Sequence, residues 1–244
     1  MTVNIPPTVL PTKKPNRQRF RRPWNIDKDC VLCLMPEVNT TWRDYSGHGN
    51  DGTIVGATTI HNARFGEGLL FDGTDDYVSV PDDDSLDLQT TLSCEAWIST
   101  VDANDQAIIN KQDTTANFRG YLFFQDDEKI CLEVNGWDGF AIGAVRVIGT
   151  TEINDGIWHH VVATKLTKDA SSINLYVDGV LETMVTDTDV YDGDATNATA
   201  LNVGRRYRLV GDELEWTGYI DEARVYNRVL EAWEVRALFE LGKP

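Results

Sequence analysis

The stretch ARFGEGLLFDGTDDYVSVPDDDSLDL occupies residues 63–88 and decides the fold class. Gly73 permits a tight turn, because glycine has no Cβ to clash at positive φ. After that turn, Val78 and Val80 lie on one face of an extended chain and Tyr77 and Ser79 on the other, since side chains alternate along a strand. A turn followed by this alternation predicts a short strand of an antiparallel sheet.

Runs rich in β-branched and aromatic residues recur along the chain, as strands require. They are YVSV (77–80), LSCEAWIS (92–99), YLFF (121–124), KICLEV (129–134), WHHVVATKL (158–166), INLYV (173–177) and ALNVG (200–204). Asp178-Gly179 and Asn135-Gly136 are two-residue hairpin signals. Apolar residues at helical spacing occur in LEAWEVRALFEL (230–241). The pattern predicts an all-β fold, a two-sheet antiparallel jelly-roll sandwich with one short C-terminal helix.

Charge is distributed unevenly along the 244 residues. Six of the 22 Lys and Arg residues lie in residues 1–25, which contain no acid, whereas all 39 Asp and Glu residues follow. A body this acidic repels nucleic acid and anionic membranes, so we expect neither as a partner. No run approaches the roughly 18 apolar residues that a membrane helix needs, so we expect no membrane insertion.

Residues 1–25 differ from the rest and are predicted to form an extended basic arm ahead of one β-sandwich over residues 26–244. The arm holds five of the eight prolines, which fix φ and remove backbone donors. We expect it to anchor the chain to other protein subunits in an oligomeric assembly, or alternatively to fold back on its own domain. Its anchoring side chains are predicted to be Lys13, Lys14, Arg17, Arg19, Phe20, Arg21, Arg22 and Trp24.

The first residues, MTVNIPPTVLPTKKPNRQRF, lack the apolar segment of a secretory signal peptide. We therefore expect the protein at the surface of a virion or another assembly, as a decoration or fibre protein, and not secreted by the general pathway. Cys30 and Cys33 form a CxxC pair that leaves a redox or zinc site open as an alternative. Cys94 and Cys131 lie in strand-like runs and are predicted to be small buried hydrophobes.

Four segments in order resemble the laminin-G-like and concanavalin A-like jelly-roll superfamily, of the bacterial and phage type. They are WRDYSGHGNDGTIVGAT (42–58), the stretch 63–88, the pair DGIWHHVVATK (155–165) with INLYVDGVLE (173–182), and GYIDEARVYNRVLEAWEVRAL (218–238). The resemblance implies two packed antiparallel sheets with a concave and a convex face. Trp97 and Trp158 lie in apolar runs and are predicted to be core anchors.

The resemblance also implies a structural calcium ion. Its ligands would be side chains of Asp44 and Asp221, a side chain or carbonyl of Asn50, and the carbonyl of Gly47. Calcium takes six to eight oxygens, and a glycine-rich loop such as DYSGHGND can bring carbonyls together. The alternative is an Asx-turn loop whose Asp and Asn bond their own backbone.

The superfamily includes laminarinase-type glycosidases, which need two closely spaced carboxyl groups. In DELEW (212–216), Glu213 and Glu215 share a strand face, but Thr217 stands where a third acid belongs. We therefore expect no enzyme, with hydrolysis kept as the weaker alternative. Pentraxins hold ligand-binding calcium ions through an acidic run where this chain reads NVGRRYRLVGDE (202–213). Arg205, Arg206 and Arg208 replace those acids and argue against pentraxin-like binding. They are expected to pair with the acidic body or, alternatively, to meet an acidic glycan.

The predicted function is therefore non-catalytic and lectin-like, either in a displayed assembly protein or in a stand-alone carbohydrate-binding module. Glycan platforms combine exposed aromatic rings with hydrogen-bonding groups. The best such set lies in the NGWDGF segment and at Tyr207, and its predicted ligand-binding residues are Asn135, Trp137, Asp138, Phe140 and Tyr207. The alternative is that these loop aromatics pack onto the sandwich.

Overall fold

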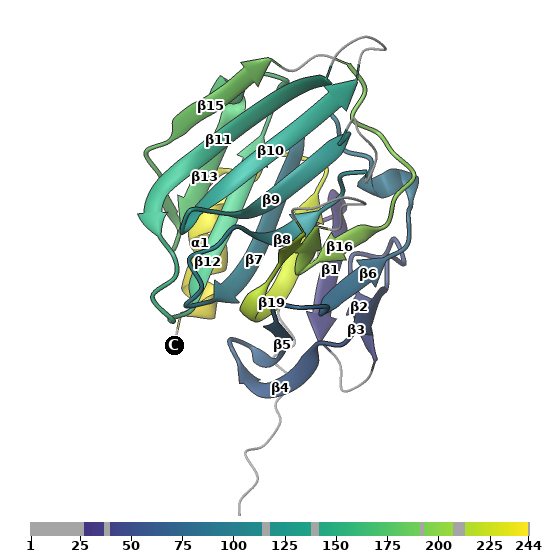
Figure 1. Cartoon of the computed structure of the whole chain (residues 1–244), viewed down its shortest axis with the longest axis vertical. Coiled ribbons are helices and arrows are strands. Elements are labelled where there is room, and N and C mark those ends of the chain that lie inside the picture. Colours follow the sequence, from purple (N-terminus) through teal and green to yellow (C-terminus); the bar gives the residue numbers. More distant parts are fainter. Residues whose placement is uncertain are drawn as a thin grey trace, which may run out of the picture.

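The computed structural model describes residues 27–36, 40–113, 118–137, 142–190, 193–206 and 213–243. In this part of the chain, two antiparallel sheets pack face to face, and a short helix lies behind them (Figure 1). The jelly-roll sandwich predicted from the sequence is thus confirmed. The predicted arm, residues 1–25, lies outside the described residues.

The first sheet, sheet A, is the rear layer in Figure 1. Its strands pair in the order β14-β13-β12-β7-β19. On its other edge, β19 pairs along one part with β5 and along another part with β1, and β4 pairs with β5. The strands are β1 (Cys30–Pro36), β4 (Thr58–Ala63), β5 (Gly66–Asp72), β7 (Leu92–Ser99), β12 (His159–Lys165), β13 (Ile173–Val177), β14 (Val180–Leu181) and β19 (Thr217–Tyr226).

The second sheet, sheet B, is the front layer and pairs in the order β2-β3-β6-β16-β8-β9-β10-β11-β15. The end of β1 also pairs with β2, so β1 joins the two layers. The strands are β2 (Thr41–Asp44), β3 (Gly52–Val55), β6 (Tyr77–Val80), β8 (Gln106–Asn110), β9 (Gly120–Asp126), β10 (Lys129–Trp137), β11 (Ile142–Glu152), β15 (Val185–Val190) and β16 (Leu201–Val203). A separate ladder joins β17 (Arg205–Arg206) to β18 (Leu214–Glu215), and 3-10 turns lie at Asp84–Leu86 and Ala170–Ser172.

The main core fills the space between the sheets. Val78 and Val80 point into it while Tyr77 and Ser79 stay half-buried on the other face, as the alternation predicts. Cys94 is buried in the same core and Cys131 in a smaller cluster, which confirms their role as buried hydrophobes. Burying such side chains removes apolar area from water, which is the main stabilising term of the fold.

The helix α1 (Ala232–Gly242) covers the outer face of sheet A and matches the predicted C-terminal helix. Glu231 and Glu234 form a capping box that satisfies backbone donors at its start. Phe239 stacks on Trp97, with 5.9 Å between ring centroids. Trp97 is therefore buried, as predicted, but it lies under α1 and not between the two sheets. The prediction for Trp158 is wrong: it precedes β12, is only half-buried, and packs on Tyr219.

Charged side chains are buried between α1 and sheet A. Arg224 donates to Glu95 over 2.9 Å and also bonds Glu222, while the hydroxyl of Tyr226 donates to Glu95 over 3.1 Å. Burial raises the pKa of Glu95, but Arg224, His160 and Tyr226 outweigh burial and hold this pKa at about 2. This carboxylate is therefore ionised and bonded inside the protein.

The predicted strands agree with the structure, except at one turn. Asp178-Gly179 forms the expected hairpin between β13 and β14, with φ of 52° and 75°. The Asn135-Gly136 hairpin prediction is wrong, because both residues lie within β10, where Asn135 pairs with Gly120 and Ala144. Within the described part, no helix has the length and apolar character needed to cross a membrane.

Candidate functional site

Asp44 lies at the end of β2 and organises the loop that was predicted to bind calcium. Its carboxylate accepts five hydrogen bonds among the described residues, at 2.7 to 3.1 Å, from the backbone N–H groups of Cys33, Ser46, Gly49 and Asn50 and from the Ser46 hydroxyl. Gly47 has a φ of 98°, which glycine adopts without strain. Both carboxylate oxygens of Asp44 are thus engaged with protein donors.

The other two predicted ligands are also bonded to the protein. The Asn50 amide donates to the Val31 carbonyl over 2.8 Å, and Asp221, which is fully buried in β19, accepts from the Phe65 backbone over 2.8 Å. The contacts seen for Asp44 and Asp221 therefore involve different segments. The local contacts of Asp44 are those of an Asx-turn loop, whereas the Asn50 amide and Asp221 bond residues distant in sequence. Calcium binding stays a prediction.

A row of mostly polar side chains crosses the outer face of sheet B, because residues paired across antiparallel strands share a face. Asn110, Leu122, Glu133 and Arg146 follow one another from β8 to β11 in the pairing register. Beside them, towards the end of β10, lies Asn135. On the same face, two positions along the strands, lies an apolar row of Ala107, Phe124, Cys131 and Ile148. Leu214 from β18 partly covers this row.

Glu133 is the centre of the polar cluster. One of its oxygens accepts from the Gln112 amide and from the Asn135 amide, each over 2.9 Å. The Gln112 and Asn135 side chains are buried, and their own carbonyl oxygens have no hydrogen-bond partner in the described structure. A buried acceptor without a donor costs about 1–3 kcal/mol, so the fold carries a cost to hold Glu133 in this orientation.

Arg146 lies opposite Glu133 on β11 and gathers further acids. Its guanidinium is 2.6 Å from Asp126, 3.6 Å from Asp187 and 3.7 Å from Glu133. The side chains of Arg146 and Glu133 keep 27% and 15% of their surface exposed, so both reach solvent. The group offers one guanidinium with five N–H donors and three carboxylates as acceptors, with a net negative charge.

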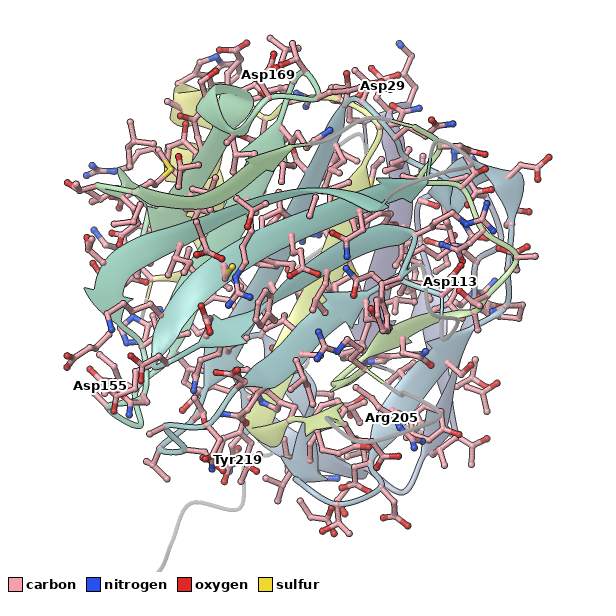
Figure 2. All side chains as sticks on the ribbon, turned by 45° about the horizontal axis from the view of Figure 1, so that its top comes forward. Asp29, Asp113, Asp155, Asp169, Arg205 and Tyr219 are labelled. Atoms are coloured by element: carbon pink, nitrogen blue, oxygen red, sulfur yellow. The ribbon has the colours of Figure 1, made fainter. Side chains whose placement is uncertain are left out.

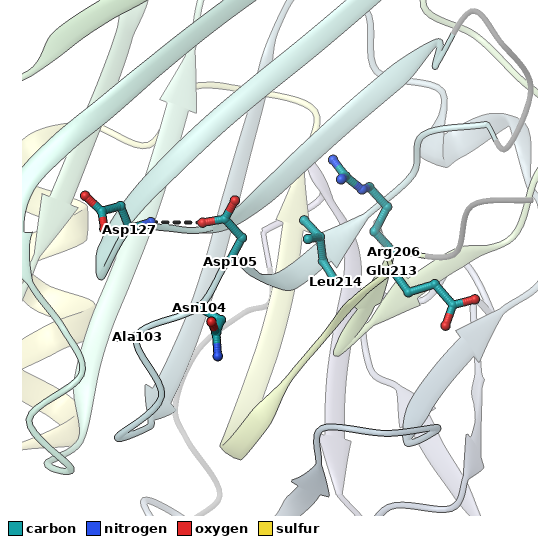
Figure 3. A pocket seen from close by; sticks show the side chains of 7 residues that line it. All are labelled: Ala103, Asn104, Asp105, Asp127, Arg206, Glu213 and Leu214. Carbon is teal, nitrogen blue, oxygen red and sulfur yellow. Dashed lines mark hydrogen bonds between the residues drawn. The ribbon is translucent and has the colours of Figure 1, made fainter. Parts of the chain in front are cut away.

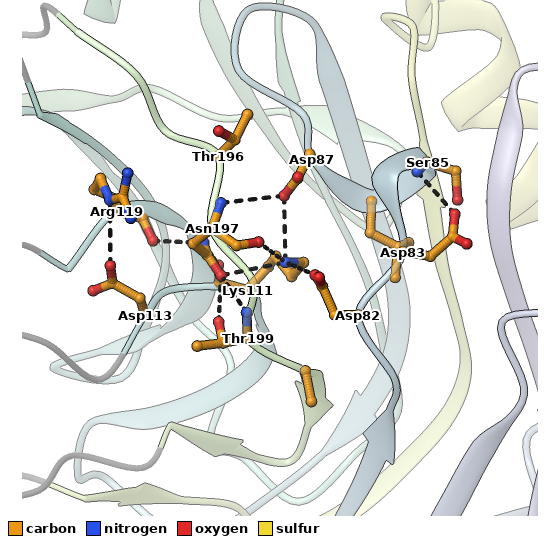
Figure 4. Close-up of polar contacts among 12 residues, drawn as sticks. Asp82, Asp83, Ser85, Asp87, Lys111, Asp113, Arg119, Thr196, Asn197 and Thr199 are labelled. Carbon is orange, nitrogen blue, oxygen red and sulfur yellow. Dashed lines mark hydrogen bonds and ion pairs between the residues drawn. The ribbon is translucent and has the colours of Figure 1, made fainter.

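A buried lysine fixes the loops beside this cluster (Figure 4). Lys111 precedes Gln112, is 1% exposed, and donates to Asp82 over 2.8 Å and to the Asn197 carbonyl over 2.9 Å. The Asn197 amide in turn donates to the carbonyls of Lys111 and Arg119. A buried ammonium needs such partners, and these bonds tie the end of β8 to the chain before β16 and so hold Gln112 in place.

Two hollows lie on the same side of the molecule. A shallow one of about 340 Å3 is lined by Tyr77, Ser79, Asn202 and Arg205. A larger, open one of about 610 Å3 is lined by Ala103, Asn104, Asp105, Asp127, Arg206, Glu213 and Leu214 (Figure 3). The larger hollow is mostly polar, and among the described lining residues neither hollow contains a group arranged for covalent chemistry.

Glu213 and Glu215 both face Arg205. The Arg205 guanidinium is 2.9 Å from Glu215 and 4.0 Å from Glu213, which confirms for Arg205 the predicted pairing with acids. Burial raises the pKa of Glu215 to about 7, against the opposing effect of Arg205. Thr217 has a hydroxyl in place of a carboxyl group, so it adds no third acid to the pair, and its backbone N–H donates to Gln106.

The predicted ligand residues can be located only in part. Asn135 belongs to the polar cluster, and the backbone of Trp137 ends β10. Asp138, Phe140, Tyr207 and the Trp137 side chain lie outside the described residues. Gln112, Glu133 and Arg146 were not predicted, because no local motif marks them.

Comparison with known proteins assigns the chain to a class. A model of the concanavalin A-like lectin/glucanases superfamily, of laminin G type, matches residues 72–236. The chain belongs to this superfamily, and the family resemblance read from the sequence is confirmed.

Solved structures with a similar fold include the binding domains of a mosquitocidal protein and of botulinum neurotoxins. The binding domain of Paraclostridial Mosquitocidal Protein 1 superposes with a TM-score of 0.67 and 17% identity over 88% of this chain and 52% of that one. The binding domain of botulinum neurotoxin serotype D/C gives 0.63 and 14% over 89% and 53%. These likenesses show the fold, and the chain spans about half the length of those domains.

A curated relative matches a shorter part. The rat Sushi, von Willebrand factor type A, EGF and pentraxin domain-containing protein 1 is 27% identical over 119 residues, which is 47% of this chain and 3% of the relative. The match shows no family for this chain, since so little of that protein is covered.

Proposed function

We propose that the protein is a non-catalytic carbohydrate-binding protein that binds a glycan at the Glu133–Arg146 cluster on sheet B. The observation that carries the proposal is the cluster itself: charged groups that reach solvent, oriented by two buried amides whose carbonyl oxygens have no partner. Proteins depart from full polar satisfaction mainly at functional sites. Sugar hydroxyls both donate and accept, as this mixture of carboxylates and guanidinium requires.

The local charge selects the class of sugar. Glu133, Asp126 and Asp187 surround the single guanidinium of Arg146, so an anionic sugar would meet repulsion. We therefore propose a neutral oligosaccharide. The similarly folded binding domain of botulinum neurotoxin DC was solved in complex with SialylT, and botulinum neurotoxin type C depends on two ganglioside molecules for cell entry. At 14% identity these structures support glycans only as a class of ligand.

A glycan array on the full chain, followed by calorimetry with the best neutral ligand, tests this proposal. Arg146→Met is expected to weaken binding at least tenfold, since each charge-assisted hydrogen bond contributes about 1.5–3 kcal/mol. The matched control is Arg236→Met, which removes an exposed arginine paired with Glu240 on α1. Absence of any glycan ligand, or equal binding by Arg146→Met, would contradict the proposal.

The absence of catalysis is part of the same proposal. Glu215 has the raised pKa of a general acid, but its side chain is only 7% exposed and is paired with Arg205. Incubation with β-glucans should release no reducing ends. Hydrolysis that disappears in Glu215→Gln or Glu213→Gln would establish an enzyme instead.

We further propose that residues 1–25 anchor this domain to other subunits, with the β-sandwich displayed at the surface of a virion or another assembly. The support is the sequence: a proline-rich basic arm with Phe20 and Trp24 precedes a strongly acidic body. Opposite charges favour association between such segments, and aromatic side chains dominate binding energy at interfaces.

A further inference from the structure

Four apolar side chains lie together at one end of the sandwich. Val101 follows β7 and Ile157 precedes β12, with exposed fractions of 76% and 58%, and Tyr219 in β19 is 36% exposed. Gly156 donates to the Thr100 carbonyl over 2.9 Å, which brings the two loops together, and Tyr219 pairs with Ser99 across the strands. Trp158 packs against Tyr219 with 5.9 Å between ring centroids. Val101, Ile157, Trp158 and Tyr219 therefore form one patch.

The patch adjoins the larger hollow, because both use the loop between β7 and β8. Asp105 in this loop accepts from the Asp127 backbone over 3.0 Å, and both carboxylates line the hollow together with Glu213 (Figure 3). Arg206 is the one basic residue in the described lining. Asp155 lies on the other side of the patch, next to Gly156. An apolar surface with carboxylates on both sides fits a basic peptide that also carries aromatic residues.

We infer that this surface, the 101–105 loop with its apolar patch and acidic hollow, binds residues 13–24 of a second copy of the chain. This rests on the proposed role of the arm as an anchor and names the surface that it uses. Phe20 and Trp24 would pack on the patch, while the flanking Lys and Arg residues would pair with Asp105, Asp127 and Glu213. The arm sequence KKPNRQRFRRPW (13–24) combines six basic residues with two aromatic residues.

Geometry excludes the same chain's Trp24 from this contact. The described domain begins at the far end of the molecule, where the Asn227 backbone donates to Asp29 over 2.9 Å. Asp29 and Tyr219 lie at opposite ends in Figure 2. The eight residues from Tyr219 to Asn227 span roughly 26 Å along an extended strand. The three residues from Trp24 to Asp27 reach at most about 11 Å, so a Trp24 side chain on this patch would have to come from a neighbouring copy.

Zero-length carbodiimide cross-linking of the full chain tests the contact. Equal amounts of protein labelled with 14N and 15N are mixed, and the peptides that contain Lys13 or Lys14 are sought. Cross-links of mixed isotope to peptides carrying Asp102, Asp105 or Asp127 are the expected result. Cross-links only within one chain, or only to carboxylates elsewhere on the surface, would overturn the inference.

A substitution on the patch gives an independent measurement. Val101→Asp combined with Ile157→Asp should weaken self-association at least tenfold by light scattering, whereas Leu166→Asp, at a 57% exposed site elsewhere, should leave it unchanged. Normal association by the double variant, when deletion of residues 1–25 abolishes it, would refute this surface and leave the arm's role intact. A full chain that stays monomeric at all concentrations would refute both. Glycan binding is read in parallel and should not change.

Discussion

The outer faces of the two sheets differ in how far their charged side chains are buried and paired. On sheet A, α1 covers Glu95 and Arg224, whose side chains keep 1% and 7% of their surface exposed and bond to each other. On sheet B, no described helix covers Glu133 and Arg146, which stay partly exposed, and the amides beside them leave their carbonyl oxygens without a partner. Both faces hold a glutamate and an arginine on neighbouring strands, so residue type alone does not separate them.

The difference shows how to distinguish a structural ion pair from a binding site. Under α1 each charge is met by a protein partner, as burial in a medium of low dielectric requires. On sheet B the same groups keep bonding capacity directed outward. Removing a charge should therefore cost mostly stability on sheet A and mostly ligand binding on sheet B.

The largest expected effect follows from removing one arginine on each face. Arg224→Met leaves the buried carboxylates of Glu95 and Glu222 without their cation, and should lower the free energy of unfolding by about 3–5 kcal/mol. Arg146→Met removes a partly exposed arginine and should cost about 1 kcal/mol or less. Urea unfolding measures both. Similar losses for the two variants would show that the faces do not differ in the way argued here.

The fold was largely accessible from the sequence, because alternation and turns are local signals. Val78 and Val80 mark β6, and Asp178-Gly179 marks a hairpin, without knowledge of distant residues. Asn135-Gly136 carries the same kind of signal, yet β10 continues through it, since the hydrogen bonds to Gly120 and Ala144 outweigh the local preference for a turn.

The site was accessible only in part, because it depends on register. Asn135 was predicted because it lies in a loop-like run with aromatic residues. Gln112, which follows β8, and Arg146, on β11, meet Glu133 only through the pairing of β8 to β11. Register shifts at Ala107/Ile109 and Arg146/Val147 make such pairing hard to derive from sequence. At Asp44, the same glycine-rich acidic sequence is compatible with oxygens that bind calcium and with oxygens that accept bonds from backbone N–H groups. The sequence therefore does not distinguish a calcium site from an Asx-turn loop.

A smaller effect is expected at Asp44, which locks a loop beside the junction of the two sheets. Asp44→Ala removes five hydrogen bonds and should lower the free energy of unfolding by about 2–4 kcal/mol. Because these bonds account for both carboxylate oxygens, the Asx-turn explanation predicts an equal loss in calcium and in chelator. Asp51→Ala, which removes one acceptor from the same loop, is the control. A wild-type melting temperature that falls in chelator, and no longer does so in Asp44→Ala or Asp221→Ala, would instead confirm a calcium site.

The smallest expected effect is a pH dependence at His159, on the edge of the surface that α1 covers. Its two ring nitrogens lie 2.9 Å from Asp178 and 3.2 Å from Asp155, and although burial lowers its pKa, these carboxylates raise the pKa above the usual value of 6.5. A raised pKa means that folding favours the charged ring. The stabilisation is therefore complete below about pH 6.5 and is lost as the pH rises through the folded-state value.

The measurement is the difference in unfolding free energy between wild type and His159→Gln at pH 5.5 and at pH 9. We expect a larger difference at the lower pH, by about 1 kcal/mol or less, since both carboxylates are partly exposed and screened by solvent. His48→Gln, at an exposed position in the Asp44 loop, controls for the loss of a histidine as such. A difference that is constant with pH would mean that the two carboxylates do not stabilise the charged ring. The contrast between a face closed by protein partners and a face left for a ligand would then rest on Arg224 and Arg146 alone.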